Sequence, residues 1–235
     1  METLKSFTSN NFRDPVTAII DDFRNGWNVV FSPGANTSKK MSIGDAFAFY
    51  YKFSVIPIIL LIAMLYVLLS IAMAIFSQVP TIGHTLSLIG NLGVFGVIVF
   101  AVLWLWIAVP IAILIQAALY QLVGGALMGK FKGGYSGTVT ACIYAAFPSV
   151  MIAWLGFIPV LGGLLSFLFG IYSIYILVTA LANQHKTTKG TAFLVWLVWV
   201  LIGVIIVVAL VFFIVAMFGG AILHSLGGTT GTAMP

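Results

Sequence analysis

The sequence predicts an all-α polytopic membrane protein: a bundle of five transmembrane helices preceded by an amphipathic helix at the membrane interface. The chain is 62% hydrophobic and 6% charged, whereas about a quarter of the residues of a soluble domain carry charge. Apolar runs recur that reach the roughly 20 residues needed to cross a bilayer as a helix. We therefore expect a cytoplasmic segment over 1–52, a membrane domain over 53–218 and an external Gly/Thr-rich tail over 219–235.

The N-terminal segment has no apolar core of the kind found in a cleavable signal peptide. Asp14 followed by Pro15 is a favoured helix start, since the side chain caps the helix and proline suits its first position. Apolar residues then recur at helical spacing: Ile19, Ile20, Phe23, Trp27, Val30 and Phe31. We expect an amphipathic helix lying in the interface over 14–31. A helix packed on the inner end of the bundle is the alternative.

A second helix start is expected at Ile43, because Ser42 and Asp45 form a capping-box pattern. This helix should enter the membrane near Phe53. The five spans are expected at about 53–76, 92–128, 138–155, 158–182 and 191–218.

The second span is too long for a simple crossing. Counting about 20 residues back from Met128 reaches the outer boundary near Val109, with Trp104 and Trp106 close to it, as in an aromatic belt. Residues 92–103 would tilt, lie flat or project outward. The segment is therefore either one long helix or a span with an additional outer segment.

Basic residues occupy alternate loops. Six of the ten precede the first span, and the others are Lys130, Lys132, Lys186 and Lys189. The loop after the first span and the C-terminal tail carry neither Lys nor Arg, so five crossings place every basic residue on one side. Since cytoplasmic loops are enriched in Lys and Arg, we expect a cytoplasmic N-terminus and an external C-terminus. The four loop lysines are also candidate contacts for anionic lipid head groups.

Three stretches carry a family resemblance. They are GGYSGTVTACIYAAFPSVM, which has a mid-helix proline, the hairpin GFIPVLGGLL, and IYSIYILVTALANQHKTTKGTAFLVWLV, which joins two spans through a short His/Lys loop. Over roughly residues 40–218 the chain resembles the Yip-domain family, multi-pass proteins named for interaction with Ypt/Rab GTPases. The resemblance implies five spans, a cytoplasmic N-terminus and a non-enzymatic role in organising membrane or recruiting partners.

The chain departs from the eukaryotic members of that family in its N-terminal segment. Their Tyr-Gly-Pro-type motif is replaced by Phe31-Ser32-Pro33-Gly34, and their long acidic or Pro-rich arm is missing. The chain is similar to the short prokaryotic versions, so we expect a prokaryotic cell membrane and infer no Rab partner.

Few features of the sequence indicate an enzyme. No Asp or Glu follows Asp45, which removes most mechanisms that need a carboxylate in the membrane. His84 and His224 fall in external segments and His185 in an inner loop, so no two histidines face each other across a span as a haem site would require. Metalloprotease, nucleophile-elbow and phosphate-loop motifs are absent from the sequence. We expect no catalysis, no cofactor, no bound metal and no nucleic-acid partner; lipids and other membrane or membrane-associated proteins are the expected partners.

Two groups of residues are candidate sites within the membrane. Depth counting from the inner boundary places four polar side chains at one level: Tyr120, Gln121, Tyr144 and Tyr175. Such a layer either joins helices by hydrogen bonds or lines a pocket for a lipid or small molecule. Gly125 and Gly129 have the spacing of a helix-contact pair, with loop flexibility as the alternative.

Three functions follow from these patterns. The first is the Yip-type role in organising membrane or recruiting partners. The second is that of a small, cofactor-free structural subunit of a larger membrane complex, such as a respiratory assembly. The third is conduction of lipid or solute.

Overall fold

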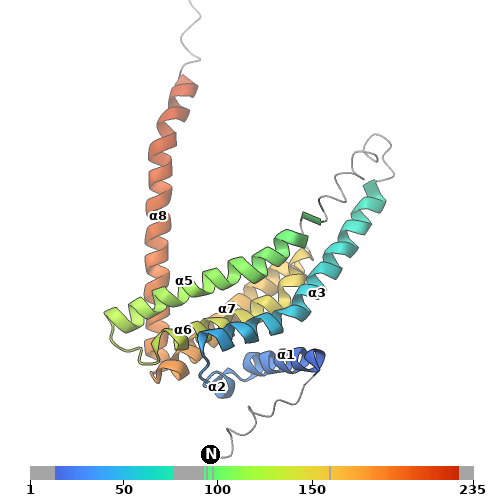
Figure 1. Ribbon diagram of the computed structural model, residues 1–235. Coiled ribbons are helices and arrows are strands. Elements are labelled where there is room, and N and C mark those ends of the chain that lie inside the picture. Colours follow the sequence, from blue (N-terminus) through green and yellow to red (C-terminus); the bar gives the residue numbers. More distant parts are fainter. Residues whose placement is uncertain (1–13, 77–92, 94, 97, 159, 228–235) are drawn as a thin grey trace, which may run out of the picture.

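The computed structural model describes residues 14–76, 93, 95–96, 98–158 and 160–227. Within them, five helices are long and apolar enough to cross a membrane: Ile43–Ile75, Ile98–Leu127, Gly134–Gly156, Leu161–His185 and Lys189–Met217. The predicted all-α, five-span architecture is confirmed (Figure 1). The expected tail 219–235 begins inside the last helix, α8 (Lys189–Gly227), which continues to Gly227.

Both predicted helix starts are present. In α1 (Pro15–Phe31), the Asp14 carboxylate accepts a hydrogen bond from the Val16 N–H at 3.2 Å. α2 (Pro33–Asn36) is a single turn that leads toward α3 (Ile43–Phe76). At the start of α3, the Ser42 hydroxyl accepts from the Asp45 N–H at 3.1 Å and donates to the Asp45 carboxylate at 2.7 Å. These caps satisfy backbone donors that a helix start leaves open.

The second span is one continuous helix from Ile98 to Leu127. It contains a π-helical turn (Trp104–Ala108), α5 (Val109–Gln121) and a second π-helical turn (Leu122–Leu127). Residues 98–103 thus continue the span as helix, and the long-helix alternative holds over the described part. Residues 92, 94 and 97 lie outside the described residues.

Pro110 explains the first π-helical turn. Proline has no N–H, and its ring crowds the carbonyl four residues earlier, here that of Trp106. In this segment of the span the Tyr51 hydroxyl of α3 donates to the Trp106 carbonyl at 3.2 Å, and the Tyr50 hydroxyl donates to the Leu105 carbonyl at 2.7 Å. Freed carbonyls in a membrane need such partners, so the irregular turn is also where α3 is tied to the second span.

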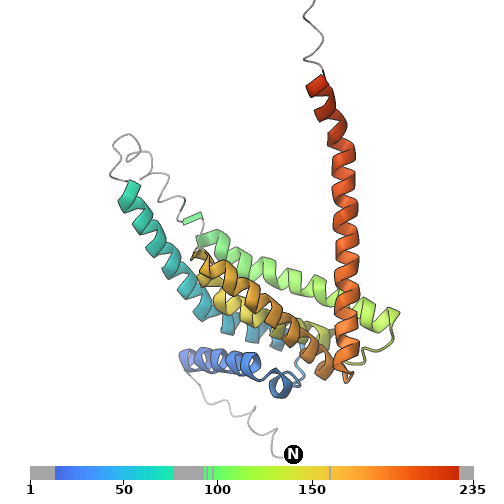
Figure 2. The ribbon, with the colours of Figure 1, turned by 180° about the vertical axis from the view of Figure 1, so that it is seen from behind.

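The bundle is centred on α6 (Gly134–Ile152), in which every residue from Gly137 to Tyr144 is buried. A helix that is apolar and buried on all sides lies in the middle of its neighbours. α7 (Leu161–His185) packs along α6 after a 3₁₀ turn (Ala153–Phe157), and α3 and α5 contact its other sides. Figures 1 and 2 show these four helices side by side, while α8 leaves them at a steep angle.

Candidate interfacial site

α1 is fixed along the first turns of α3. The Phe23 ring stacks on Phe53 with ring centroids 5.7 Å apart, and Val29 and Val30 are buried in the main core. A Cβ at Gly26 would overlap the Phe53 ring, so this close approach requires glycine. α1 therefore packs on the bundle, as the alternative interpretation of the sequence has it.

α1 also carries an apolar stripe that the bundle leaves uncovered. Val16, Ile20 and Phe31 are 58%, 49% and 75% exposed, and Trp27 stacks on Phe31 with centroids 5.2 Å apart. Val16, Ile20, Trp27 and Phe31 are successively four, seven and four residues apart, and this spacing places their side chains along one side of a helix. The helix thus has one side on the bundle, one polar side and one exposed apolar side, so contact with the bundle and contact with an interface are compatible.

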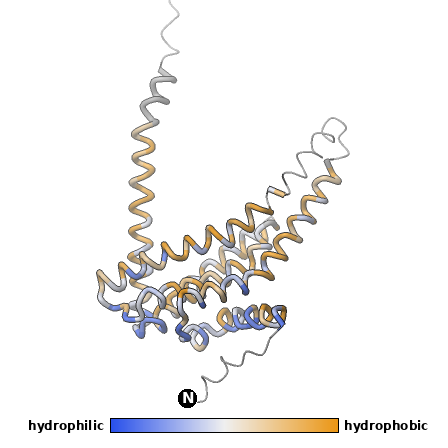
Figure 3. Tube along the Cα trace, viewed as in Figure 1, coloured by the Kyte–Doolittle hydropathy of each residue, from blue (hydrophilic) through white to orange (hydrophobic). Residues whose placement is uncertain are grey.

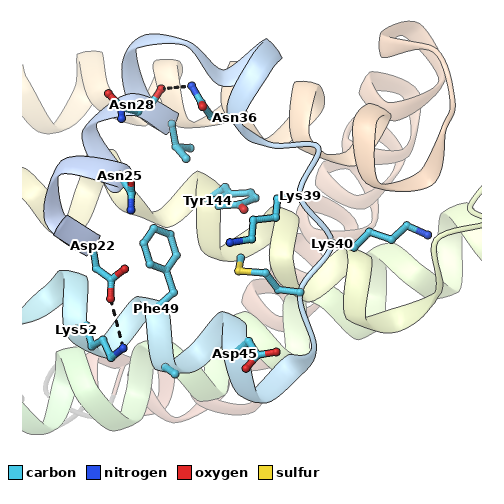
Figure 4. A pocket seen from close by; sticks show the side chains of 13 residues that line it. Asp22, Asn25, Asn28, Asn36, Lys39, Lys40, Asp45, Phe49, Lys52 and Tyr144 are labelled. Carbon is cyan, nitrogen blue, oxygen red and sulfur yellow. Dashed lines mark hydrogen bonds and ion pairs between the residues drawn. The ribbon is translucent and has the colours of Figure 1, made fainter. Parts of the chain in front are cut away.

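A polar cavity of about 520 Å³ lies between α1, the segment before α3, the first turns of α3 and α6. Its polar lining comes from Asp22, Asn25, Asn28, Asn36, Lys39, Lys40, Asp45 and Lys52. Phe49 of α3 and Tyr144 of α6 supply aromatic walls (Figure 4). This volume is within the range of small-molecule sites, roughly 300–1,000 Å³.

Both carboxylates of the cavity are engaged within the protein. The Lys52 ammonium lies 3.5 Å from the Asp22 carboxylate, and the Asp45 carboxylate accepts from Ser42. Figure 4 shows the Lys39 side chain reaching over the cavity, whereas Lys40 points away from it.

The end of α7 holds the segment that closes this cavity. The Asn183 amide donates to the Thr37 hydroxyl at 2.8 Å and to the Gly34 carbonyl at 3.1 Å. The Gln184 amide donates to the carbonyls of Thr37 at 2.7 Å and Lys39 at 2.9 Å. Two consecutive side chains thus position the backbone that carries Lys39.

The next residue, His185, holds a different loop. Its Nδ1 accepts from the Gly133 N–H at 3.0 Å, and its Nε2 lies 3.0 Å from the Thr138 hydroxyl. Because a backbone N–H only donates, Nδ1 carries no proton, and Nε2–H can donate to Thr138. Thr138 then donates to the Gln121 amide oxygen at 2.7 Å. The ring also stacks on Phe131, with centroids 4.0 Å apart.

These contacts correct the expected loop position of His185. α7 continues to His185 and α8 begins at Lys189, so the loop is only Lys186 to Thr188. His185 is fully buried rather than solvated. Its partners, Gly133 and Thr138, lie at the start of α6, 52 and 47 positions away in the sequence, so no local pattern predicts these contacts. The sequence does carry one signal for these contacts: three adjacent polar residues, Asn183, Gln184 and His185, end an apolar run.

The hydrogen bonds of α7 bring three Lys-bearing segments together at one end of the bundle. Segments 34–40, 130–138 and 183–189 meet there, and Figure 3 shows hydrophilic segments gathered at that end. Lys130, Lys132, Lys186 and Lys189 are all exposed, and the Lys189 ammonium lies 5.5 Å from the centre of the Tyr175 ring. Which side of a membrane this end faces stays a prediction.

The four residues expected in one polar layer have different surroundings in the fold. Tyr120 is buried and its hydroxyl accepts from Gln116 at 3.1 Å, while Gln121 pairs with Thr138. Tyr144 lines the cavity, whereas Tyr175 is 48% exposed on the outside of α7 and stacks on Tyr172. No hydrogen bond joins any two of the four. Counting residues along a helix predicts the depth of a side chain in the membrane. The rotation of the helix about its axis decides which way that side chain points.

The expected glycine contact does not form within this chain. A Cβ at Gly125 would meet Gln121 of its own helix, and Gly129 lies beyond the helix with φ +63° and nothing within 4 Å. Gly133 makes the close approach instead, since a Cβ there would overlap the Gln184 carbonyl oxygen.

Among the described residues, no group of three or more His, Cys, Asp or Glu side chains is placed to hold a metal ion. His84 and the side chain of His224 lie outside the described residues. No family model, curated protein or solved structure matches the chain significantly.

Proposed function

We propose that this protein is a non-enzymatic integral membrane protein of the Yip-domain type that organises the inner leaflet of a prokaryotic cell membrane. The observation that carries the proposal is the uncovered apolar stripe of α1, on a helix fixed to the end of a membrane bundle. A helix with adjacent apolar and polar sides inserts at the boundary between head groups and acyl chains. Insertion into one leaflet alone expands that leaflet and favours curved membrane.

The distribution of lysines supports the orientation. Three basic segments share one end of the bundle with α1, and loops rich in Lys and Arg face the cytoplasm. In this orientation α1 and the polar cavity lie at the cytoplasmic surface, and the C-terminus is external.

Sorting of the reconstituted protein between small and large vesicles tests the proposal. The wild-type chain is expected to be enriched in small vesicles, whose outer leaflet is more strongly curved. The triple variant Val16→Ser, Ile20→Ser, Phe31→Ser should lose most of this enrichment. Full burial of one large apolar side chain in the membrane contributes about 1.5–3 kcal/mol to the free energy of insertion, and the variant removes three such side chains. The polar-side variant Thr17→Ser, Arg24→Gln is the control. Equal sorting of the triple variant and the wild type would contradict the proposed role.

One observation favours a second function, that of a subunit in a larger membrane complex. The most apolar stretch of α8 has no buried residue, so this helix offers its sides to another membrane helix. Native purification followed by mass spectrometry tests this role. Stoichiometric co-purification with redox subunits would support it, and a homogeneous preparation of this chain alone would count against it.

A further inference from the structure

We propose that five exposed lysines at one end of the bundle form a docking surface for the head groups of anionic phospholipids. The five, named here the basic surface, are Lys40, Lys130, Lys132, Lys186 and Lys189. Four of them are the loop lysines already expected to contact head groups, and the fold adds Lys40. The proposal goes beyond the role of the α1 stripe, because docking of head groups requires no membrane curvature. The two proposals can therefore fail separately.

The hydrogen bonds of Gln184 and His185 at the end of α7 bring the basic surface together. The Gln184 amide donates to the backbone carbonyl just before Lys40 at 2.9 Å. His185 Nδ1 accepts from the backbone N–H just after Lys132 at 3.0 Å, and Lys186 is the residue that follows His185. Gln184 and His185 are both buried. Buried side chains therefore fix the three lysine-bearing segments relative to one another.

No carboxylate offsets the charge of the basic surface. The sequence contains neither Asp nor Glu after Asp45. Asp45 accepts from Ser42, and the Asp22 carboxylate lies 3.5 Å from the Lys52 ammonium. In the described part of the chain, none of the five lysines forms an ion pair with a carboxylate. Like charges held close together repel one another, so an anionic partner would stabilise this end of the bundle.

The basic surface lies where the apolar spans end. The spans leave residues 128–133 and 186–188 as the loops between them. Loops this short keep their lysines close to the head-group layer, which is about 5–8 Å thick on each side of the hydrocarbon core. Leu127, just before the first loop, and Phe193, near the start of α8, are exposed apolar side chains. Ammonium groups next to apolar surface match a phospholipid, which joins an anionic head group to acyl chains.

One lysine already has an interfacial neighbour. The Lys189 ammonium lies 5.5 Å from the centre of the Tyr175 ring, and Tyr175 is exposed on the outside of α7. A cation over an aromatic ring is favourable, and tyrosine is enriched where membranes meet water. The pair therefore places this ammonium at the level of the head groups.

The test measures lipid binding to the full chain in a neutral detergent by native mass spectrometry. Dioleoyl phosphatidylglycerol and dioleoyl phosphatidylcholine are the probes. We expect phosphatidylglycerol to bind at least about tenfold more tightly, because each lysine near an anionic surface contributes about fivefold. Equal binding of the two lipids would overturn the proposal.

Two soluble competitors separate lipid from other anions. Inorganic phosphate and polyglutamate, each at the same concentration of negative charge as the lipid, should leave phosphatidylglycerol bound. Displacement by phosphate would assign the basic surface to a soluble anion, and displacement by polyglutamate would assign it to an acidic protein. Either result would overturn the lipid assignment.

Charge-matched variants locate the surface. Lys132→Gln with Lys186→Gln should weaken phosphatidylglycerol binding about tenfold or more. Arg24→Gln with Lys52→Gln removes the same charge from α1 and α3, outside the basic surface, and should change binding by less than about threefold. If the two double variants bind alike, the assignment is refuted.

A charge-preserving variant checks that the loss is electrostatic. Lys132→Arg with Lys186→Arg should keep the preference for phosphatidylglycerol, because the guanidinium also binds phosphate. Both substituted side chains are exposed, so all these variants should unfold at the wild-type temperature in detergent without lipid. Loss of the preference in the arginine variant at an unchanged unfolding temperature would overturn the proposal.

Discussion

His185→Phe removes the two polar contacts that the imidazole makes at the end of α7. The new ring has nearly the same size and can keep the stack on Phe131, which measures 4.0 Å between centroids. Phenylalanine offers no acceptor to the Gly133 N–H, which the imidazole accepts at 3.0 Å. Thr138 retains its hydrogen bond to Gln121. The contact of His185 Nε2 with the Thr138 hydroxyl, 3.0 Å, is lost as well, so the variant measures the two polar contacts of the imidazole without the packing of its ring.

Each lost hydrogen bond costs about 1 kcal/mol, so we expect about 2 kcal/mol of destabilisation. His185→Ala should cost about 4 kcal/mol, because it also removes the burial of the ring, about 2 kcal/mol. Lys132→Ala, on an exposed side chain of the same loop, should stay within about 0.5 kcal/mol.

Unfolding by SDS in mixed micelles, followed by circular dichroism, measures these differences. Hydrogen–deuterium exchange of the loop before α6 supplies a local measurement, and the Gly133 amide should exchange faster in both His185 variants. If His185→Phe unfolds with the free energy of the wild type and Gly133 keeps its protection, the hydrogen bond does not hold the loop.

Three further predictions concern the caps, the docking of α1 and the topology. Gly26→Leu should displace α1 from α3, and limited proteolysis should then cut within α1 in the variant but not in the wild type; equal protection would show that α1 docks otherwise. Ser42→Ala should cost about 1 kcal/mol of helix stability in the same SDS titration, while Ser38→Ala should cost much less, and equal losses would argue against the cap. In a chain freed of its native cysteine, Lys186→Cys and Thr230→Cys should be labelled from opposite sides of the membrane, and labelling of both from one side would show that α8 does not cross and would refute the five-span topology.

The features predicted correctly from the sequence are local ones. The Asp14 and Ser42 caps involve residues two and three positions apart, and each span is set by its own run of apolar residues. Hydropathy left open whether residues 92–128 form one long helix or a span with an outer segment, and the structure shows one helix from Ile98 to Leu127. Hydropathy and capping operate within a few turns, so no knowledge of neighbouring helices is needed.

The predicted polar layer shows that depth along a helix does not determine the surroundings of a side chain. Tyr144 and Tyr175 were placed at one depth by counting 1.5 Å per residue, yet one lines a cavity and the other lies on the outside of α7. Depth along a helix is a property of the sequence. Orientation about the axis depends on which neighbour packs against which side.

The sequence by itself determined that this is a membrane protein, how many apolar helices it has and where two of them begin. Only the tertiary structure decided what the polar residues do. Asn183 reaches Thr37 across 146 positions and His185 reaches Gly133 across 52, and the cavity needs Tyr144 of α6 beside side chains from α1 and α3. Such contacts form only after the helices have packed, because the free energy of each depends on partners that no local pattern of residues specifies.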